Sequence, residues 1–231
     1  MQRSNIYILV FSAIMTVLIG GAMSLTSVLL KPAQDKQVEL DTKKKILGAV
    51  MDISTFNTPE EILNLYKARV KSVVVDIEGE IISTDAKGNP LIAEKVNAQK
   101  NHKIAREDRL YPIYMILNES DPNVVEAYVF PMFGLGLWDW ISGYIALESD
   151  LNTVKGVAFD HKGETPGLGA RITEEKVRNR YKENKKIFNE AGDLESITMV
   201  KGEGKMGLST HEVDGLSGAT ITAKGVNKML K

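Results

Sequence analysis

The chain has 231 residues, of which 43% are hydrophobic and 26% are charged, and its formal net charge is −1. A near-neutral charge without a basic stripe argues against nucleic acid as the main partner. The sequence contains no cysteine, which excludes disulfides, a thiolate zinc site, a cysteine nucleophile and an iron–sulfur cluster held by this chain alone.

The amino-terminal stretch predicts a membrane anchor. Residues 5–30 carry no charged side chain, and about 20 apolar residues are enough for a helix to cross the hydrocarbon core of a bilayer. The run is longer than the apolar part of a typical cleaved signal peptide, although AMS at 22–24 resembles a small-residue cleavage site. We expect residues 1–4 to be a cytoplasmic terminus, 5–30 a single transmembrane helix and 31–36 a polar linker. Because Lys and Arg are nearly balanced across the span, the charges alone do not set its orientation.

The segment after the linker predicts two helices and a hairpin. A helix is expected to begin with residues 43–50 and to end near Pro59. A second helix is expected over 59–69, where proline stands at the first helical position and two acids follow. The β-branched runs of residues 71–84 predict a hairpin that turns at Glu78-Gly79.

The rest of the chain predicts a sheet followed by helices. Strands are expected at 111–117, 124–130, 143–150 and 154–160, and short strands at this spacing indicate an antiparallel sheet or meander. Later elements are expected at three ranges, which are a helix over 174–191, a strand over 196–202 and a helix over 218–231 with Ile221, Met229 and Leu230 as apolar positions. The fold class is therefore α+β, with residues 37–231 forming an antiparallel-sheet domain with flanking helices.

The motif DGLSGAT, which ends at Thr220, allows two interpretations. Asp214-Gly215 is a turn dipeptide, and Ser217 or Thr220 can cap the following helix. Alternatively, Gly218-Ala219 lets another group approach the backbone, and the free N–H groups at a helix start favour a phosphate. In that case the Thr220 hydroxyl is available for esterification.

Two other stretches are candidates for binding a flat ring. In HKGETPGLGARI, which begins at His161, Gly167 and Gly169 would let a ring press against the loop around Leu168, but a surface turn is equally consistent. His161 lacks ligand spacing or a paired serine arrangement, so catalysis by it is not expected. In GLGLWDW, two roles are open for Trp138. It could pack in the core or at a membrane interface, or it could form an aromatic wall beside a ligand. This stretch matches neither a dinucleotide fingerprint nor a P-loop. No metal site is expected, and Gly202-Glu203-Gly204 is typical of a loop without chemistry.

Together these segments resemble one family. The resemblance is carried by an N-terminal membrane helix, GLGLW from Gly134, GYIALE from Gly143, GETPGLG from Gly163 and DGLSGAT ending at Thr220. The chain resembles the FMN-binding family of NqrC, a component of the sodium-translocating NADH:quinone oxidoreductase. NqrC is related to RnfG of the Rnf electron-transport complex. The GYIALE and GLGLW stretches favour the NqrC branch.

The resemblance implies a covalent cofactor. It predicts one FMN per chain, joined through a phosphoester to Thr220, with the FMN-binding part at about residues 120–231. The site residues that it implies are Asp214, Ser217, Gly218 and Ala219 for recognition and the phosphate, Glu164, Thr165, Leu168 and Gly169 for the isoalloxazine, Trp138 as a neighbour and Lys201 as a counter-charge.

The resemblance also implies a cellular role. The domain would lie on the periplasmic side of a bacterial inner membrane and relay electrons between NADH and ubiquinone while sodium is pumped, without oxidising NADH by itself. Its partners would be the other subunits, a flavin transferase and membrane lipid.

The sequence leaves three alternatives open. One is an RnfG-like flavoprotein, and another is a non-redox anchored ligand-binding ectodomain. The third is an anchored hydrolase that would use Ser217 or Ser209 with His211 or His161, but it lacks a G-x-S-x-G elbow.

Overall fold

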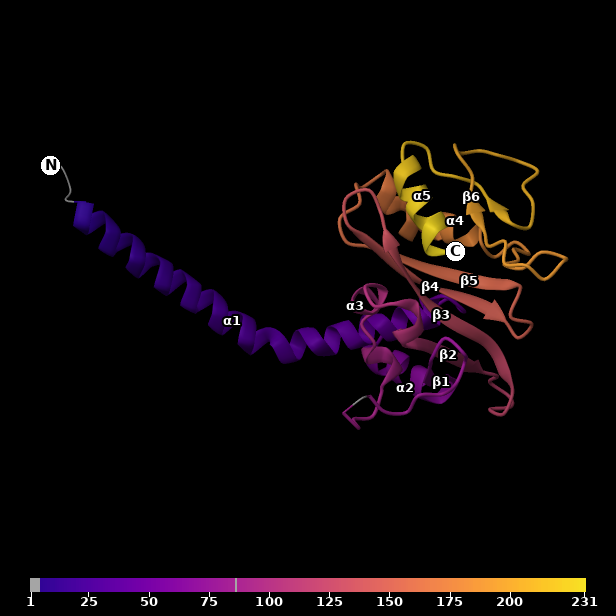
Figure 1. Cartoon of the computed structure of the whole chain (residues 1–231), viewed down its shortest axis with the longest axis horizontal. Helices are drawn as coiled ribbons and strands as arrows, with labels where there is room; N and C mark the ends of the chain where they lie inside the picture. Colours follow the sequence, from indigo (N-terminus) through magenta and orange to yellow (C-terminus); the bar gives the residue numbers. More distant parts are fainter. Residues whose placement is uncertain (1–4, 86) are drawn as a thin grey trace. The chain divides into compact units, whose positions relative to one another are not determined.

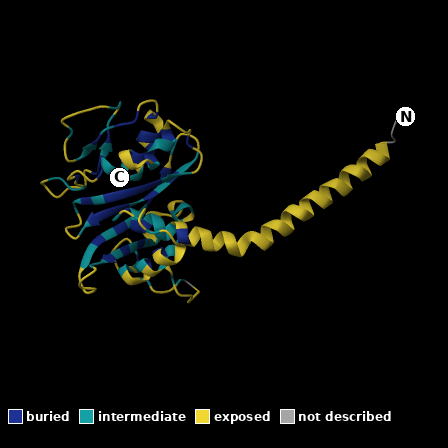
Figure 2. Cartoon of the chain, turned by 180° about the vertical axis from the view of Figure 1, so that it is seen from behind, coloured by how far each residue is buried: buried dark blue, intermediate teal, exposed yellow. Residues whose placement is uncertain are grey.

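The computed structural model describes residues 5–85 and 87–231, which divide into one unit that ends at Asp41 and another over 42–231. Helix α1 runs without interruption over Asn5–Gly48 (Figure 1). Its apolar window is long enough to cross a membrane and is wholly exposed (Figure 2). These properties agree with the predicted anchor.

The predicted polar linker at residues 31–36 is helical and belongs to α1. Pro32 lies inside the helix and removes one backbone donor. The ion pair between Lys31 Nζ and Asp35 Oδ1, at 2.7 Å with i,i+4 spacing, favours the helical form. Residues 43–48 are likewise the end of α1, so the prediction of a separate helix reaching toward Pro59 is wrong.

Helix α2 covers Pro59–Arg69, as predicted. Thr58 caps it, because its hydroxyl accepts from the Glu61 N–H at 3.2 Å and Glu61 reaches back in a capping box. Strand β1 (Val70–Val75) follows directly. The predicted hairpin over 71–84 is only partly present, because the chain turns at Gly79 but returns as a single bridge between Val75 and Ile81.

A five-stranded antiparallel meander forms the centre of the larger unit, with the order β1-β2-β3-β4-β5. This confirms the predicted sheet and the α+β class. Strands β2 to β5 are Tyr111–Leu117, Val125–Leu135, Trp140–Glu148 and Val154–His161. The short elements between β1 and β2 are η1 (Ala93–Lys95), α3 (Ala98–His102) and η2 (Arg106–Asp108).

Strands β3 and β4 are longer than predicted, and this places the site. Their pairing continues from Ala127 opposite Glu148 to Leu135 opposite Trp140. The chain then reverses over residues 136–139, where the Gly136 N–H donates to the Asp139 carbonyl at 2.9 Å. The GLGLW segment is therefore a hairpin tip that projects from one end of the sheet.

The C-terminal elements cover one face of the sheet. They are η3 (Gly169–Thr173), α4 (Glu175–Asn179), β6 (Thr198–Met199), β7 (Glu212–Val213) and α5 (Thr220–Met229). Figure 1 shows α4, α5 and β6 on the same side of the sheet. Ile141 and Val157 of the sheet share a buried cluster with Ile172, Val177 and Val226.

The predicted helix over 174–191 is wrong beyond Asn179. Its charged composition favours a helix, but its backbone pairs with other segments instead. The Lys185 carbonyl accepts from the Val154 N–H at 2.8 Å, and the Lys186 N–H donates to the Thr210 carbonyl at 3.0 Å. The predicted strand over 196–202 shortens to the two residues of β6, which pair in parallel with β7.

Helix α5 lies within the predicted range 218–231, but its start and its buried face differ from the prediction. Ala219 stands at the N-cap, and no side chain caps the helix, so neither Ser217 nor Thr220 has the predicted capping role. Ile221 is exposed, whereas Thr222 and Val226 are buried.

Candidate functional site

Three segments meet at the buried carboxylate of Glu164. Its Oε1 accepts from the backbone N–H of Leu137 at 2.7 Å and of Trp138 at 3.1 Å, both in the hairpin tip. Its Oε2 accepts from the hydroxyl of Thr222 in α5. Glu164 is only 4% exposed. The GETPGLG loop, the tip and the last helix are thus joined through one side chain.

Two glycines make room for this carboxylate. A Cβ added at Gly136 would overlap Glu164 Oε1, and a Cβ added at Gly169 would overlap Glu164 Oε2 and Thr222 Oγ1. The third glycine of interest, Gly167, has φ +75° and open space around it, so it serves the turn itself. Gly169 therefore has a packing role in the site.

Trp138 and Leu168 lie at the surface of the same cluster. The Trp138 indole Nε1 donates to Thr165 Oγ1 at 3.2 Å, although the residue is 69% exposed. Core packing of Trp138, one of the predicted alternatives, is therefore wrong. A Cβ added at Gly218 would be 2.8 Å from Leu168 Cδ2, so the GETPGLG loop contacts the DGLSGAT loop directly.

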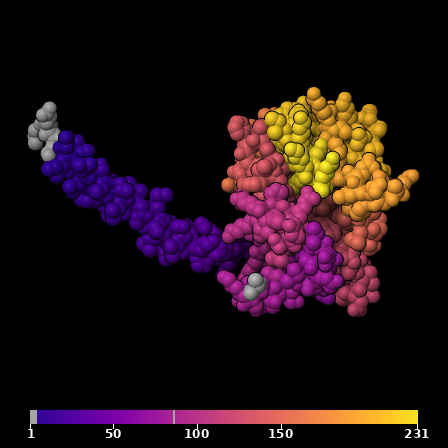
Figure 3. Space-filling view, viewed as in Figure 1, coloured from indigo at the N-terminus to yellow at the C-terminus, as the bar shows by residue number. Residues whose placement is uncertain are grey.

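Thr220 opens α5 in a form that suits modification. It is exposed, and its hydroxyl makes no hydrogen bond to the part of the chain that the structure describes. The first N–H groups of a helix have no intrahelical partner, and no side chain caps them here. The C-terminal segment with α5 is visible at the surface of the larger unit (Figure 3). An anion at this helix start would meet free donors and an accessible hydroxyl.

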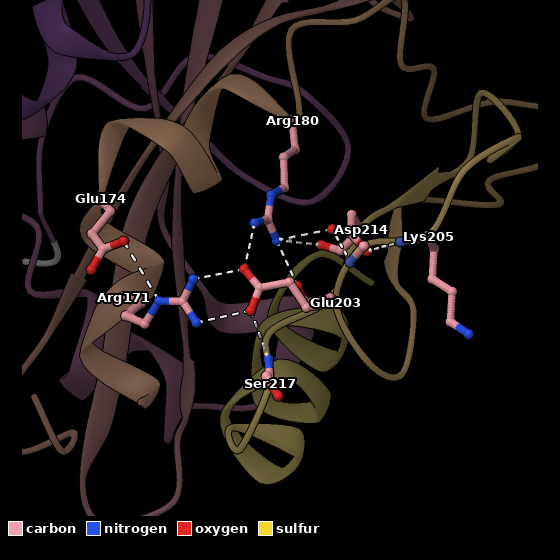
Figure 4. A network of polar contacts seen from close by, with 9 residues as sticks. Arg171, Glu174, Arg180, Glu203, Lys205, Asp214 and Ser217 are labelled. Atoms are coloured by element: carbon pink, nitrogen blue, oxygen red, sulfur yellow. Dashed lines mark hydrogen bonds and ion pairs between the residues drawn. The ribbon is translucent and has the colours of Figure 1, made fainter. Parts of the chain in front are cut away.

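A charged network holds the loop that precedes Thr220 (Figure 4). Glu203 accepts from Arg171 Nη2 at 2.6 Å, from Arg180 Nη2 at 3.0 Å and from the backbone N–H of Ser217 at 3.2 Å. Hydrogen bonds from Arg171, then Arg180 and Ser217, keep the pKa of Glu203 far below its ordinary value. Glu203 is therefore ionised at neutral pH and fixes Ser217.

The Arg180 side chain also binds backbone carbonyls of this loop. Its Nη1 donates to the carbonyls of Asp214 at 3.0 Å and Gly215 at 2.6 Å. Gly215 has no space for a side chain, because a Cβ would overlap the carbonyls of Val200 and Gly202. The DGLS turn is thus packed tightly against the 200–204 segment.

Asp214 binds backbone groups of the neighbouring loop. Its carboxylate accepts from the N–H groups of Gly204 and Lys205, each at 2.9 Å. Burial raises the pKa of Asp214, but these two hydrogen bonds together with the Arg180 charge and the Gly215 N–H outweigh that effect, so that the pKa lies below its ordinary value. In this structure Asp214 shapes the turn that leads to Thr220.

The remaining predicted residues are less closely connected. Ala219 is buried, and its carbonyl accepts from the Ala223 N–H at 2.9 Å, which begins α5. Lys201 is exposed and forms no hydrogen bond or ion pair within residues 5–85 and 87–231. Neither Ser209 nor Ser217 is hydrogen-bonded through its hydroxyl to a histidine ring in those ranges, which gives the hydrolase alternative no support. No group of three metal-ligating side chains occurs among the described residues.

Four important residues were not predicted from the sequence. Glu203, Arg171 and Arg180 form the network, and Thr222 is the partner of Glu164. An arginine pair with an isolated acid carries no periodic signal, and the segment with Arg180 has the composition of a regular helix. Thr222 was a detectable candidate, because a polar residue on the buried face of a helix needs a partner.

The residues present fit a flavin nucleotide. The three segments that meet at Glu164 carry exposed apolar side chains, which are Leu137, Trp138, Leu168 and Ile221. Such exposed apolar surface is suited to a planar ring, and the uncapped start of α5 is suited to a phosphate.

Comparison with known proteins agrees with this chemistry. Residues 136–231 match the family model for the FMN-binding domain, which begins at the hairpin tip. The chain is 31% identical to NqrC of the Na(+)-translocating NADH-quinone reductase of Pseudomonas aeruginosa, over 99% of this chain and 89% of that protein. It is 34% identical to the corresponding protein of Neisseria meningitidis serogroup B, over 96% and 84% of the two chains.

Solved structures show the same likeness. The crystal structure of NqrC of the Na(+)-translocating NADH-quinone reductase from Parabacteroides distasonis superimposes with a TM-score of 0.70 at 32% identity, covering 87% of this chain and 91% of that chain. The crystal structure of Shewanella oneidensis NqrC superimposes with a TM-score of 0.68 at 27% identity, covering 84% and 90%.

Proposed function

The chain belongs to the NqrC family of the Na(+)-translocating NADH-quinone reductase, and from this membership we propose that it carries FMN esterified to Thr220. It is a membrane-anchored flavoprotein subunit of an oxidoreductase. The observation that carries the proposal is the exposed Thr220 hydroxyl at the uncapped start of α5, which has no partner among the described residues. The sequence around it is DGLSGAT.

The residues around Thr220 have distinct roles in this proposal. The N–H groups at the start of α5 receive the phosphate, and Gly218, at φ +75°, forms the turn that leads to them. Trp138 and Leu168 flank the isoalloxazine from the hairpin tip and the GETPGLG loop. Thr165 holds the Trp138 indole in place. FMN supplies the redox chemistry, whereas the protein supplies position and electrostatics.

Attachment needs a second protein. The Thr220 Oγ1 would form the ester bond to phosphorus and lose its proton, while a flavin transferase breaks the bond between that phosphorus and the leaving group of an activated flavin donor. The 163–169 and 214–220 loops lie side by side at the surface, so that such an enzyme has access to the hydroxyl.

The wider role follows from the family. The protein would relay electrons within a complex that oxidises NADH, reduces ubiquinone and pumps sodium, and its partners would be the other subunits and membrane lipid. An RnfG-like role is the alternative, but the relatives from Pseudomonas, Neisseria, Parabacteroides and Shewanella all belong to the NADH-quinone reductase. A non-redox ectodomain leaves the FMN-binding match over 136–231 unexplained.

The first experiment tests the attachment. Full-length protein is coexpressed with a flavin transferase, denatured and run on a gel under ultraviolet light. Wild-type protein is expected to fluoresce, Thr220→Ala to be dark and Thr220→Ser, which keeps a hydroxyl, to retain signal. Mass spectrometry of the C-terminal peptide should show an FMN-sized adduct on Thr220. An unmodified peptide from the assembled complex would falsify the proposal.

The second experiment tests the periplasmic orientation. Because the chain has no cysteine, Ser120→Cys in the exposed turn after β2 introduces a unique thiol. A membrane-impermeant maleimide is expected to label this variant in intact spheroplasts. Labelling only after the membrane is permeabilised would place the domain on the cytoplasmic side.

A further inference from the structure

Two threonines at the start of α5 have opposite environments. Thr220 is exposed and its hydroxyl has no partner among the described residues, whereas Thr222 is 1% exposed and donates its hydroxyl to Glu164. Residues two apart on an α-helix are rotated by about 200°, so the two side chains face opposite sides. The burial of one hydroxyl is therefore coupled to the exposure of the other.

Glu164 is the only group outside α5 that binds the Thr222 hydroxyl in the described structure. Its hydrogen bonds come from neutral donors, which are two backbone N–H groups of the hairpin tip and this hydroxyl. No cation within the described ranges pairs with it. A buried carboxylate without a counter-ion depends on all of its hydrogen bonds, because an unsatisfied charge in the interior is costly.

The carboxylate has little freedom to move. The backbones of Gly136 and Gly169 lie against its two oxygens, so closely that neither position has room for a Cβ. A fixed acceptor and a single hydroxyl donor fix the rotation of the first turn of α5 about its axis, whereas Asn227, which bonds the Met199 N–H at 2.8 Å and the Met199 carbonyl at 3.0 Å, holds the later turns. The same acceptor also fixes the Leu137 and Trp138 backbone, and with it the Trp138 ring.

We propose that Glu164 is a positioning residue for the modification of Thr220. By binding Thr222, it holds the rotation of α5 at which the Thr220 hydroxyl faces outward, and it withholds the Thr222 hydroxyl from the same reaction. Through the tip it places Trp138 beside the modified residue. This inference rests on the proposed attachment of FMN to Thr220. In it, Glu164 acts on the site through Thr222 and the hairpin tip and does not contact the cofactor directly.

The test measures how fast the adduct forms. Wild-type full-length chain, Glu164→Ala, Glu164→Gln, Thr222→Val and Thr222→Ser are each expressed, then incubated with flavin transferase and flavin donor, and the adduct is followed by intact mass. Glutamine is the matched control, because its Oε1 can accept from the tip N–H groups and its amide can donate to Thr222 Oγ1. Thr222→Ser keeps the hydroxyl that Thr222→Val removes.

We expect Glu164→Ala and Thr222→Val to slow adduct formation by about tenfold or more, and a tenfold change corresponds to about 1.4 kcal/mol. The rates of Glu164→Gln and Thr222→Ser should stay within about threefold of the wild-type rate. Hydrogen exchange of peptides that contain residues 136–138 and 220–223 should accelerate in Glu164→Ala but not in Glu164→Gln. If Glu164→Ala does not fold, the Thr222 pair carries the test.

Several results would overturn the inference. One is wild-type rates in both Glu164→Ala and Thr222→Val. Another is a Glu164→Gln variant as slow as Glu164→Ala with normal hydrogen exchange, because charge and not position would then be responsible. An adduct on Thr222 in the Thr220→Ala chain would show that this hydroxyl is not withheld. A wild-type chain that takes no flavin contradicts the proposed function itself, and the inference falls with it.

Discussion

Two carboxylates hold the chain on either side of Thr220, and their surroundings contrast. Glu164 is buried among neutral donors and binds Thr222, two residues after Thr220. Glu203 is partly exposed, pairs with Arg171 and Arg180, and binds the N–H of Ser217, three residues before Thr220. One acid therefore fixes the helix and the other fixes the loop.

The difference between these acids shows which physical variables control each half of the site. The Glu164 contacts depend on close packing, because the backbones of Gly136 and Gly169 enclose the carboxylate. The Glu203 contacts depend on charge, because two guanidinium groups supply most of its donors. Steric changes should act on the first, and removal of the carboxylate charge should act on the second.

The largest effect is expected from a steric change at Gly169. Gly169→Ala places a methyl group against Glu164 Oε2 and Thr222 Oγ1. Overpacking of this kind typically costs about 1–3 kcal/mol, and we expect a loss of that size in the free energy of unfolding. Urea denaturation of the detergent-solubilised full chain, followed by the circular dichroism of the sheet domain, measures it.

Gly163→Ala is the matched control in the same loop. Its Cβ would be 3.5 Å from the Asp139 Cβ and 3.9 Å from the Trp138 Cβ, which are ordinary contacts. We expect its effect to stay within about 0.5 kcal/mol. If Gly163→Ala and Gly169→Ala lost equal free energies of unfolding, the loop would tolerate no added side chain at either position. Close packing around Glu164 would then not explain the effect of Gly169→Ala.

The sequence predicted those elements whose signals are local. Pro59 with two following acids identified α2, and short strand-forming runs at regular spacing identified the central strands. The anchor followed from the uncharged run before Lys31. These patterns are set by the chain's own geometry, so they can be recognised without tertiary information.

The failures occur where distant segments supply the hydrogen bonds. Residues 180–191 look helical by composition, but their backbone pairs with β5 and with Thr210. Residues 31–36 were predicted as a polar linker, yet α1 continues through Pro32 at the loss of one donor. Composition cannot reveal a partner that lies far away in the chain.

The candidate site divides in the same way. The motifs placed Thr220, Leu168 and Trp138 in one region, and the structure brings their loops together. The Glu203 network was missed because an acid between two glycines carries no pattern that points to Arg171 and Arg180. Residue type indicated which groups could react, but only the fold shows which groups hold them.

The smaller effect, which concerns Glu203, is a response to acid. Hydrogen bonds from Arg171, Arg180 and the Ser217 N–H lower the pKa of Glu203 in the folded chain below the 4.5 of an unperturbed glutamate. A group with a lowered folded pKa stabilises the fold above its unfolded pKa, and this contribution is lost as the pH falls toward the folded pKa. Wild-type stability should therefore decline as the pH drops below about 4.5.

Glu203→Gln separates this group from the other acids. At pH 7 we expect the variant to be less stable than wild type by about 1 kcal/mol, since exposed ion pairs are weakened by solvent. The difference should shrink as the pH falls below 4.5, because Glu203 then takes up a proton in the unfolded wild-type chain, and this reduces the advantage that its ionised form gives the folded chain. Melting temperatures between pH 7 and pH 3 measure it, and Glu164→Gln serves as the comparison. If Glu203→Gln kept a constant offset at every pH, the loop before Thr220 would be held by shape, and the contrast between the two carboxylates would disappear.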